Sequence, residues 1–412
     1  MYEFETVFEF SVPRIKFGWN AVNEIGYEAR RLNSRRILIV TDKGVMGTGI
    51  PDSVKTILDK DGGVEVFIFS DVSPEPSKDD FERCIDFARG ADVDLLVAVG
   101  GGSSIDVAKT TGILLRWGGN LIDYIAPPTG LGKRIPGPGK PVIAVPTTAG
   151  TGSEVSPASI ISLPDKKIKE GITSVYQKPI LAIVDPILTL SMPPNVTAIT
   201  GIDALSHAIE AYITRRFDAK TASKPDGRPV YGGGNPVTDI FASTAVRLIG
   251  RFLPRAYSNP LDFEARWHMS LGSLLAGIAF TNAGLGLAHA IALAVGGRLH
   301  YTHGEVIAAV LPSVLEFNSL SNPRALRRIA ELMDEPVGGL SSREASLKAI
   351  SAVRELIVSL KLPSSLRDLG AREEEVPAIV EDTLKIKRLL EGNPRRVERR
   401  DLEEMILRNL NP

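Results

Sequence analysis

The side chains with the clearest capacity for chemistry are four potential metal ligands. Only five histidines occur in the 412 residues, and His207 follows Asp203 by four positions. On a helix this spacing puts both side chains on one face, one turn apart, where they can share a cation. His289 lies in an apolar helical pattern, and His303 follows it by fourteen residues, beyond a glycine pair at positions 296 and 297. We expect those glycines to end the helix, so that the chain returns and brings His303 beside His289.

Three imidazoles and one carboxylate suit Fe²⁺ or Zn²⁺ and would make a poor site for Ca²⁺, which prefers oxygen ligands. Cys84 is the only cysteine, so we expect no thiolate in the site. Because structural zinc sites usually contain cysteine ligands, a structural role for zinc is less favoured here. The spacing alone leaves an alternative open, since no short signature such as HExxH is present. In that alternative Asp203 and His207 are an ordinary helical pair, and the other histidines are core or loop residues.

The two remaining histidines have weaker patterns. His268 follows a tryptophan in a helical pattern and is predicted to be a packed or surface residue. His300 precedes His303 by three positions, so it is a candidate for a proton relay in the same cavity. Cys84 also lies in a helical pattern and is predicted to be packed, not catalytic.

A second group of residues has the pattern of a phosphate site. The apolar run at residues 94–99 leads directly into Gly100, Gly101, Gly102 and Ser103, and a helical pattern follows. A strand that passes through glycines into a helix N-terminus lets backbone N–H groups reach a phosphate, which the helix dipole also favours. Ser103 can cap that helix and offer its hydroxyl to the same anion. Because Ile105 stands where GxGxxG has its third glycine, a plain strand-to-helix turn remains the alternative.

Two further segments fit the same ligand. Asp42 follows the apolar run at residues 36–41, where a carboxylate can accept both ribose hydroxyls of an adenosine and repel a 2′-phosphate, favouring NAD over NADP. Thr147, Thr148 and Thr151 lie in the sequence PTTAGTGSE, which follows another strand pattern. Their hydroxyls can hold a nicotinamide ribose or a pyrophosphate close to the backbone. Each segment, taken alone, is also compatible with an ordinary turn or cap.

The elements that must position these residues differ between the two halves of the chain. Up to about residue 192, short β-branched runs alternate with helical patterns, which predicts an α/β domain with a mostly parallel sheet. The predicted strands are residues 36–41, 64–69, 94–99, 142–145 and 181–185, with residues 8–13 as a further edge strand. Beyond this point nearly all patterns are helical. We therefore expect a dinucleotide-binding α/β domain at residues 1–192 and an all-helical metal-binding domain at residues 193–412, with Pro193 and Pro194 at the break.

Two loops, at residues 126–141 and 215–235, are long and rich in glycine, proline and basic residues. Loops of this length in enzymes are lids, partner contacts or disordered insertions. Seven cations in and beside them can pair with a substrate carboxylate, although solvated loop charges are the simpler interpretation. They are Lys133, Arg134, Lys140, Arg215, Arg216, Lys220 and Arg228.

The composition excludes several classes of protein. With 48 basic and 49 acidic residues, the formal net charge of −1 provides no field for steering toward nucleic acid or a membrane surface. The N-terminus carries Glu3, Glu5 and Glu9 and lacks the pattern of a signal peptide, so a cytoplasmic protein is expected. Gln177 is the only glutamine, and scarce Cys and Gln beside abundant Arg and Glu is a pattern enriched in thermophile proteins.

Together these segments resemble the iron-containing (group III) alcohol dehydrogenase family. The matching sequences are VGGGSSIDVAK at residues 99–109, PTTAGTGSEV at 146–155, GIDALSHAIEAY at 201–212, and GLGLAHAI with a later HGE within residues 284–305. The resemblance implies a Rossmann-like domain, a helical domain and a site in the cleft between them. It further implies metal ligation by Asp203, His207, His289 and His303, and cofactor contacts by Asp42, Gly101, Gly102, Ser103, Thr147, Thr148, Thr151 and, less directly, Lys169.

The resemblance also implies a mechanism, in which the cation lowers the pKa of a substrate hydroxyl and hydride passes to the nicotinamide. The chain departs from many members at Leu293, where they carry a histidine one turn after the residue matching His289. Proton release would then use His300 or water. The resemblance further implies a homodimer formed through the N-terminal edge strand.

Three other functions are alternatives to a simple alcohol or hydroxy-acid dehydrogenase. The loops and the sequence GGGNPVTDI at residues 232–240 resemble the hydroxyacid–oxoacid transhydrogenase branch, which acts on substrates such as 4-hydroxybutyrate. That branch is similar to this chain in lacking the extra histidine at the position of Leu293. The choice between this branch and a simple dehydrogenase therefore stays open. A lyase of the dehydroquinate synthase type needs a cluster of Lys and Arg for a phosphate, which is absent around Asp203 and His289. A non-enzymatic binding protein does not account for the combined metal and nucleotide residues.

Overall fold

The computed structural model describes residues 3–60, 62–127, 129–166, 168–299 and 301–411, so His300 lies outside the described residues. The chain forms two compact units, a sheet unit at Val12–Met192 and a helical unit that starts at Pro193 and also includes the segment up to Ser11. The expected first domain, residues 1–192, differs from the sheet unit by that N-terminal segment. Its backbone explains the difference, because Glu5 N–H donates to Lys220 O and Ser11 N–H donates to Asn282 Oδ1, both in the helical unit.

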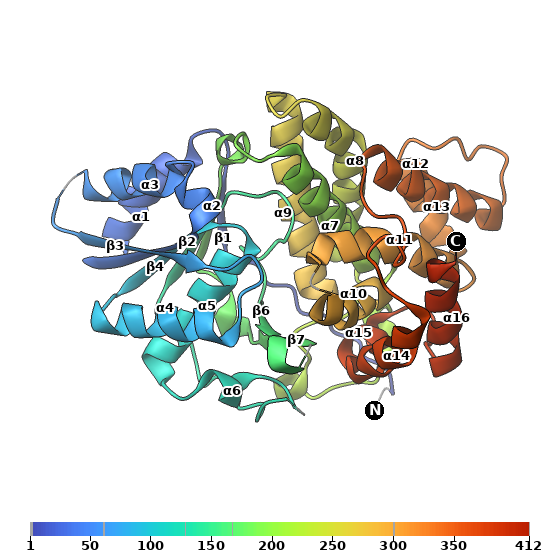
Figure 1. The fold of residues 1–412 in the computed structure, drawn as a ribbon, viewed down its shortest axis with the longest axis horizontal. Coiled ribbons are helices and arrows are strands. Elements are labelled where there is room, and N and C mark those ends of the chain that lie inside the picture. Colours follow the sequence, from blue (N-terminus) through green and yellow to red (C-terminus); the bar gives the residue numbers. More distant parts are fainter. Residues whose placement is uncertain (1–2, 61, 128, 167, 300, 412) are drawn as a thin grey trace. The chain divides into compact units, whose positions relative to one another are not determined.

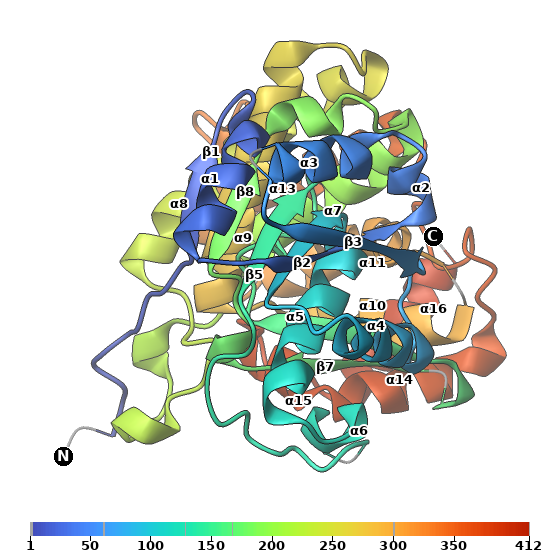
Figure 2. The same ribbon diagram turned by 90° about the vertical axis from the view of Figure 1, so that its left-hand side faces the viewer.

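The sheet unit contains six parallel strands in the order β1-β8-β5-β4-β2-β3. Figure 1 labels β1, β2, β3 and β4 of this sheet, and β5 and β8 are labelled in Figure 2. Their bounds are β1 Arg14–Phe17, β2 Arg36–Asp42, β3 Glu65–Val72, β4 Leu95–Gly100, β5 Val142–Pro146 and β8 Leu181–Val184. The predicted fold class, a parallel α/β sheet followed by a helical region, is confirmed. The edge strand expected at residues 8–13 is wrong; the strand begins at Arg14, after Pro13, which has no N–H to donate to a ladder.

Alternate residues of the central strands explain why helices cover both faces of this sheet (Figure 2). One core cluster joins Leu38, Val40 and Leu96 to side chains of α4 (Lys78–Gly90) and α5 (Gly102–Trp117). The other joins Ile37, Ile39 and Val97 to α1 (Ile25–Arg31) and α3 (Ile50–Asp59). Because successive strand residues point to opposite faces, a continuous apolar run fills both cores. Cys84 is buried in the first cluster, as expected, and burial raises the pKa of its thiol to about 12.

The order of the strands creates a natural ligand position. From β2 the chain passes outward to β3, and it then returns to β4 on the other side of β2. Connections from β2 and β4 therefore leave in opposite directions, and ligands of open α/β sheets bind at the carboxyl ends of such a strand pair. Asp42 ends β2 and Gly100 ends β4, so two of the predicted cofactor segments meet at this point.

An antiparallel hairpin, β6 (Ala158–Leu163) with β7 (Ile168–Thr173), was not predicted. Its polar and charged residues weaken the alternation that identifies a strand in sequence. Ser162 N–H donates to Pro76 O, which ties β6 to the loop after β3. Two short helices, α2 (Lys43–Met46) and α6 (Leu121–Tyr124), complete the sheet unit.

The helical unit contains ten α-helices among its described residues. Their bounds are α7 Pro194–Ile213, α8 Pro236–Ser258, α9 Phe263–Ala283, α10 Leu287–Leu299, α11 His303–Ser319, α12 Pro323–Leu332, α13 Ser342–Ser359, α14 Val376–Lys385, α15 Lys387–Gly392 and α16 Arg399–Leu410. The expected break at Gly296 and Gly297 is wrong, because α10 continues to Leu299. Helical glycine costs about 1 kcal/mol relative to alanine, and the packing of α10 against α11 and α14 outweighs that cost.

No single helix in the described residues has the length and apolar character needed to span a membrane. The consecutive helices α9 and α10 together have enough length and a sufficiently apolar composition, but a bend of 100° lies between them. Both long loops pack within their own unit. In the first, Trp117 Nε1 donates to Gly137 O at 3.0 Å. In the second, Ser223 N–H donates to Glu5 Oε2 at 3.2 Å. The second loop therefore holds the N-terminal segment in the helical unit.

Candidate metal and dinucleotide sites

Asp203 lies at the centre of three histidines in the helical unit. Its Oδ1 atom is 3.7 Å from His207 Nε2, 3.8 Å from His289 Nε2 and 3.8 Å from His303 Nε2. The four side chains come from three helices, with Asp203 and His207 one turn apart on α7, His289 on α10 and His303 at the first position of α11. The structure thus brings together all four residues that the sequence singled out as ligands.

The four side chains are not equally enclosed. Ligand atoms of Asp203, His207 and His289 all lie within 4.8 Å of one another, and all three residues are buried. The His207 ring stacks on the rings of His289 and Phe280, with centroids 4.7 and 4.5 Å away. His303 lies outside this tight group, with its side chain 27% exposed. Three of the candidate ligands are therefore fixed by packing, and the fourth, His303, is the more exposed one.

Glu210 was not singled out as a site residue, and it orients His289. Its buried carboxylate lies 2.7 Å from His289 Nδ1 and accepts N–H groups of Gly286 at 3.0 Å and Ala288 at 2.8 Å. With two backbone donors the group is an acceptor, so His289 Nδ1 carries the proton and Nε2 presents its lone pair. This carboxylate–histidine arrangement is typical of metal-ligating imidazoles. The sequence signal was its position, three residues after His207 on the same helix.

These residues fit a divalent cation. Atoms bound to one tetrahedral cation at about 2.1 Å lie about 3.4 Å from one another, close to the observed separations from Asp203 Oδ1. His289 Nε2 is buried and has no hydrogen-bond partner among the described residues, an arrangement that is costly unless a ligand satisfies it. The donor set of imidazole nitrogen and carboxylate oxygen suits Fe²⁺ and Zn²⁺.

Two further residues that the sequence singled out, His268 and Leu293, lie on helices α9 and α10. His268 on α9 stacks on Phe252 with centroids 4.1 Å apart, and burial lowers the pKa of its imidazole. Its packed position agrees with the structural interpretation. Leu293 lies one turn after His289 on α10 and is partly buried, so an apolar side chain occupies that turn.

The predicted dinucleotide residues lie at strand ends in the sheet unit. Helix α5 begins at Gly102, directly after β4, with Gly101 as its N-cap. Thr147 follows β5, and its N–H donates to Gly100 O at 3.0 Å. The N-terminus of a sixteen-residue helix and a threonine-rich loop therefore adjoin each other at the carboxyl edge of the sheet, where backbone N–H groups can receive a phosphate.

Two glycines of this turn are required by close contacts. A Cβ on Gly100 would lie 2.5 Å from Ser104 Oγ, and one on Gly102 would lie 2.8 Å from Thr151 Cγ2. A Cβ on Gly101 would lie 3.6 Å from Thr148 Cγ2, which is ordinary contact. Thr148 and Thr151 thus pack directly on the start of α5, so the two predicted cofactor segments form one surface.

Three of the predicted cofactor side chains already have contacts. The expected capping role of Ser103 is wrong, because Gly101 is the N-cap and Ser103 Oγ donates to Pro74 O at 2.6 Å. Asp42 Oδ1 accepts the N–H of Val45 at 3.0 Å and caps α2. Lys169 on β7 is buried, with its ammonium 2.8 Å from Glu75 Oε2. Asp42 Oδ2 is 3.5 Å from Ser104 Oγ, so it keeps acceptor capacity for a ribose.

Several loop cations are paired with carboxylates of their own unit. Lys133 lies 3.0 Å from Asp123, Arg228 lies 3.5 Å from Glu5, and Arg216 pairs with Asp239. Lys220 donates to Tyr231 O, and burial lowers the pKa of its ammonium. These pairings favour the simpler interpretation, in which the loop charges stabilise the loops themselves.

Two family models match the chain, one in each of its two units. Residues 13–186 match the family model described as iron-containing alcohol dehydrogenase, and residues 230–410 match the C-terminal domain model of the same family. The chain belongs to the iron-containing alcohol dehydrogenase family. It is therefore an oxidoreductase, and the family predicted from the sequence motifs is confirmed.

Relatives within the iron-containing alcohol dehydrogenase family carry several activities. The chain is 34% identical over 407 residues to a mitochondrial hydroxyacid-oxoacid transhydrogenase of Xenopus tropicalis, covering 95% of this chain and 88% of the relative. It is 38% identical to a 1,3-propanediol dehydrogenase of Klebsiella pneumoniae, covering 92% and 93%. The crystal structure of a 1,3-propanediol oxidoreductase superposes with a TM-score of 0.89 at 36% identity, covering 98% of this chain and all of that one.

Proposed function

We propose that this enzyme binds a divalent cation, most favourably Fe²⁺, through Asp203, His207, His289 and His303, and uses it with NAD to oxidise an alcohol or a hydroxy acid. The observation that carries the proposal is the convergence of three imidazole Nε2 atoms at 3.7–3.8 Å from one carboxylate oxygen. Zn²⁺ is the alternative cation, since this donor set accepts both.

A bound cation would supply Lewis acidity, which polarises a substrate oxygen and eases loss of its proton. Glu210 keeps His289 in the tautomer that offers Nε2 toward Asp203. The stacked rings of Phe280 and His207 exclude water from one side of the cluster, which strengthens charge interactions there. His303 is the least enclosed ligand, so substrate approach from its side is the simplest arrangement.

We infer that the dinucleotide binds to residues 1–192, at the carboxyl ends of β2 and β4, and that residues 193–412 bind the metal. NAD would supply the hydride acceptor. Gly101, Gly102 and Ser103 offer the helix N-terminus to the pyrophosphate, and Thr147, Thr148 and Thr151 line the adjoining loop. Asp42 and Lys169 would flank the riboses, and the carboxylate of Asp42 favours NAD over NADP.

A hydroxyacid–oxoacid transhydrogenase is the second candidate. Its support is the 34% identity to the Xenopus tropicalis transhydrogenase and Leu293 in the turn after His289. A substrate carboxylate would need an unpaired cation, and Lys133 and Arg216 already have carboxylate partners. We therefore place simple alcohol or hydroxy-acid oxidation first.

The experiment is anaerobic loading of the purified chain with Fe²⁺ or Zn²⁺, followed by assays with a panel of alcohols and hydroxy acids and added NAD. Metal-dependent NADH formation is the expected result. Turnover of 4-hydroxybutyrate with 2-oxoglutarate without added NAD would identify the transhydrogenase instead. No metal-dependent turnover with any pair of substrates would contradict the proposal.

Two lesser proposals concern the whole molecule. β1 lies at the edge of its sheet, and an edge strand can pair with a second copy of the chain to form a homodimer, which sedimentation would test. The scarcity of Cys and Gln favours a heat-stable enzyme, and a thermal unfolding midpoint below about 60 °C would contradict this.

A further inference from the structure

A buried ion pair on α5 has no part in the proposed chemistry. Lys109 is 1% exposed, and its ammonium lies 2.9 Å from Asp106 Oδ1. Burial lowers the pKa of Lys109, which the neighbouring Asp106 opposes. A buried ion pair is a weak source of stability, because the loss of hydration offsets the attraction. A contribution to stability alone therefore does not explain why Asp106 and Lys109 are buried together.

Lys109 makes hydrogen bonds to several acceptors in the irregular segment that leads into β6. Its ammonium donates to Ser153 Oγ at 2.7 Å, lies 3.2 Å from Ser153 O and 3.5 Å from Ser156 O, and also donates to Ala158 O. The segment itself is a tight turn, in which Val155 N–H donates to Gly152 O. One ammonium with three protons thus fixes the path of the chain from Ser153 to the start of β6.

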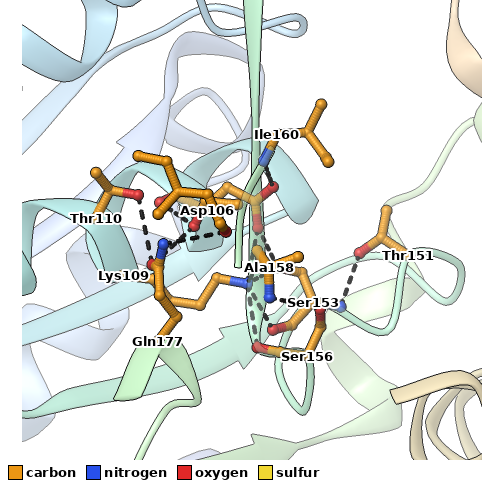
Figure 3. A network of polar contacts seen from close by, with 11 residues as sticks. Asp106, Lys109, Thr110, Thr151, Ser153, Ser156, Ala158, Ile160 and Gln177 are labelled. Carbon is orange, nitrogen blue, oxygen red and sulfur yellow. Dashed lines mark hydrogen bonds and ion pairs between the residues drawn. The ribbon is translucent and has the colours of Figure 1, made fainter. Parts of the chain in front are cut away.

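Asp106 holds both ends of the same segment (Figure 3). Ser153 Oγ donates to Asp106 Oδ1, and Ile160 N–H donates to Asp106 Oδ2 at 2.8 Å. Since the Ser153 hydroxyl also accepts from Lys109, it bridges the two charges. The result is a closed set of polar contacts between α5 and residues 153–160.

The spacing on α5 links this network to the cofactor surface. Gly102, Asp106 and Lys109 stand four and seven positions apart, and therefore share one face of the helix. Thr151 packs on that face at Gly102, where a Cβ would lie 2.8 Å from its Cγ2. Thr151 also accepts the N–H of Ser153 through its Oγ1, at 3.3 Å. Moving Ser153 would consequently move Thr151 relative to the N-terminus of α5.

We propose that Asp106 and Lys109 are positioning residues for the dinucleotide, which hold the loop at residues 147–153 against the N-terminus of α5 so that both segments meet the cofactor in a fixed geometry. The inference rests on the proposed NAD site. It adds that affinity for NAD depends on two buried charges that do not touch it, because preorganised partners lower the cost of ordering on binding.

The test uses the metal-loaded full chain. Fluorescence titration measures its NADH dissociation constant, and steady-state kinetics measure its KM for NAD and its kcat. The double variant D106N/K109M removes both charges of the pair together, so that neither Asp106 nor Lys109 is left buried without its partner. We expect its NADH dissociation constant to rise about tenfold, and its KM for NAD to rise similarly, with kcat within about twofold. S153A, which removes only the bridging hydroxyl, should raise the dissociation constant about threefold.

E28Q is the matched control, because Glu28 is a buried carboxylate in the same unit that pairs with Arg14, Lys16 and Arg31. It should lower the thermal midpoint without changing NADH affinity. Unchanged NADH affinity in the folded double variant would overturn the inference, and if that variant does not fold, unchanged affinity in S153A would do so. Failure of the wild-type chain to bind NADH would instead contradict the proposed function itself.

Discussion

The two units assemble their candidate sites in different ways. In the sheet unit, the site consists mainly of backbone groups and small side chains at strand ends, and the strand order brings them together. In the helical unit, three imidazoles converge on one carboxylate oxygen of Asp203, and the four side chains come from three helices. In the proposed sites, many small contacts would contribute to dinucleotide binding, whereas each of the few metal ligands would be individually required. The comparison predicts that single substitutions will have large effects in the helical unit and graded effects in the sheet unit.

The largest effect is expected at the centre of the metal cluster. Asp203→Asn replaces the carboxylate that faces all three imidazoles, and it should lower kcat/KM by about 10³-fold or more, since a Lewis acid contributes several kcal/mol. NADH affinity should stay within about twofold of wild type, measured by fluorescence titration. A kcat/KM near the wild-type value would contradict the role of the cluster.

Glu210→Gln should weaken metal binding without abolishing it. The amide is a poorer acceptor for His289 Nδ1–H and for two backbone N–H groups, so the metal dissociation constant should rise about 10–100-fold. Competition with a chromophoric chelator measures this constant. Asp382→Asn is the control, as Asp382 is a buried carboxylate of the same unit, paired with Arg298 and Lys385. Equal losses of metal affinity in both variants would indicate a general loss of packing instead.

In the sheet unit, Asp42→Ser should change cofactor preference by a smaller factor. Removing the carboxylate at the end of β2 relieves its repulsion of a 2′-phosphate, so the ratio of kcat/KM for NAD to that for NADP should fall about tenfold. Steady-state kinetics with both cofactors measure the ratio. The control is Asp71→Asn, since Asp71 is an exposed carboxylate that pairs with Lys43. An unchanged ratio in Asp42→Ser would remove this residue from the ribose site.

The last effect concerns the pH dependence of stability in the sheet unit. Burial raises the pKa of Glu154 from 4.5 to about 7, so the native state binds more protons than the unfolded state between these values. The contribution of Glu154 to the free energy of unfolding should therefore fall by about 1–3 kcal/mol as the pH rises from about 4.5 to 7, and it should stay lower above that range. Denaturant titrations of wild type and Glu154→Gln across this range test the sign. A wild-type stability that rises more steeply than that of the variant would contradict it.

Much of this architecture could be predicted from the sequence. The central strands are near-continuous apolar runs, and α7 carries Asp203 and His207 at a helical spacing, so local patterns identify them. The hairpin of β6 and β7 lacks such a pattern. The continuation of α10 through Gly296 and Gly297 depends on packing against helices that are distant in the sequence, which a local glycine signal cannot report.

The supporting residues of both sites were missed for a related reason. Glu210, Asp106 and Lys109 all lie within the quoted family motifs, yet their partners are distant in sequence. Glu210 contacts His289 seventy-nine residues away, and Asp106 contacts Ser153 forty-seven residues away. Sequence spacing identifies residues that share a helix face, and it does not reveal which distant donor a buried carboxylate will meet.

The most direct test of the account is the metal content and NADH affinity of His289→Ala, compared with wild type after identical anaerobic loading with Fe²⁺. The account predicts about one bound cation per chain in the wild type, little or none in the variant, and no dehydrogenase activity in the variant, while NADH binds both proteins with the same affinity. A variant that keeps its metal and its turnover would contradict the assignment of the metal to the helical unit.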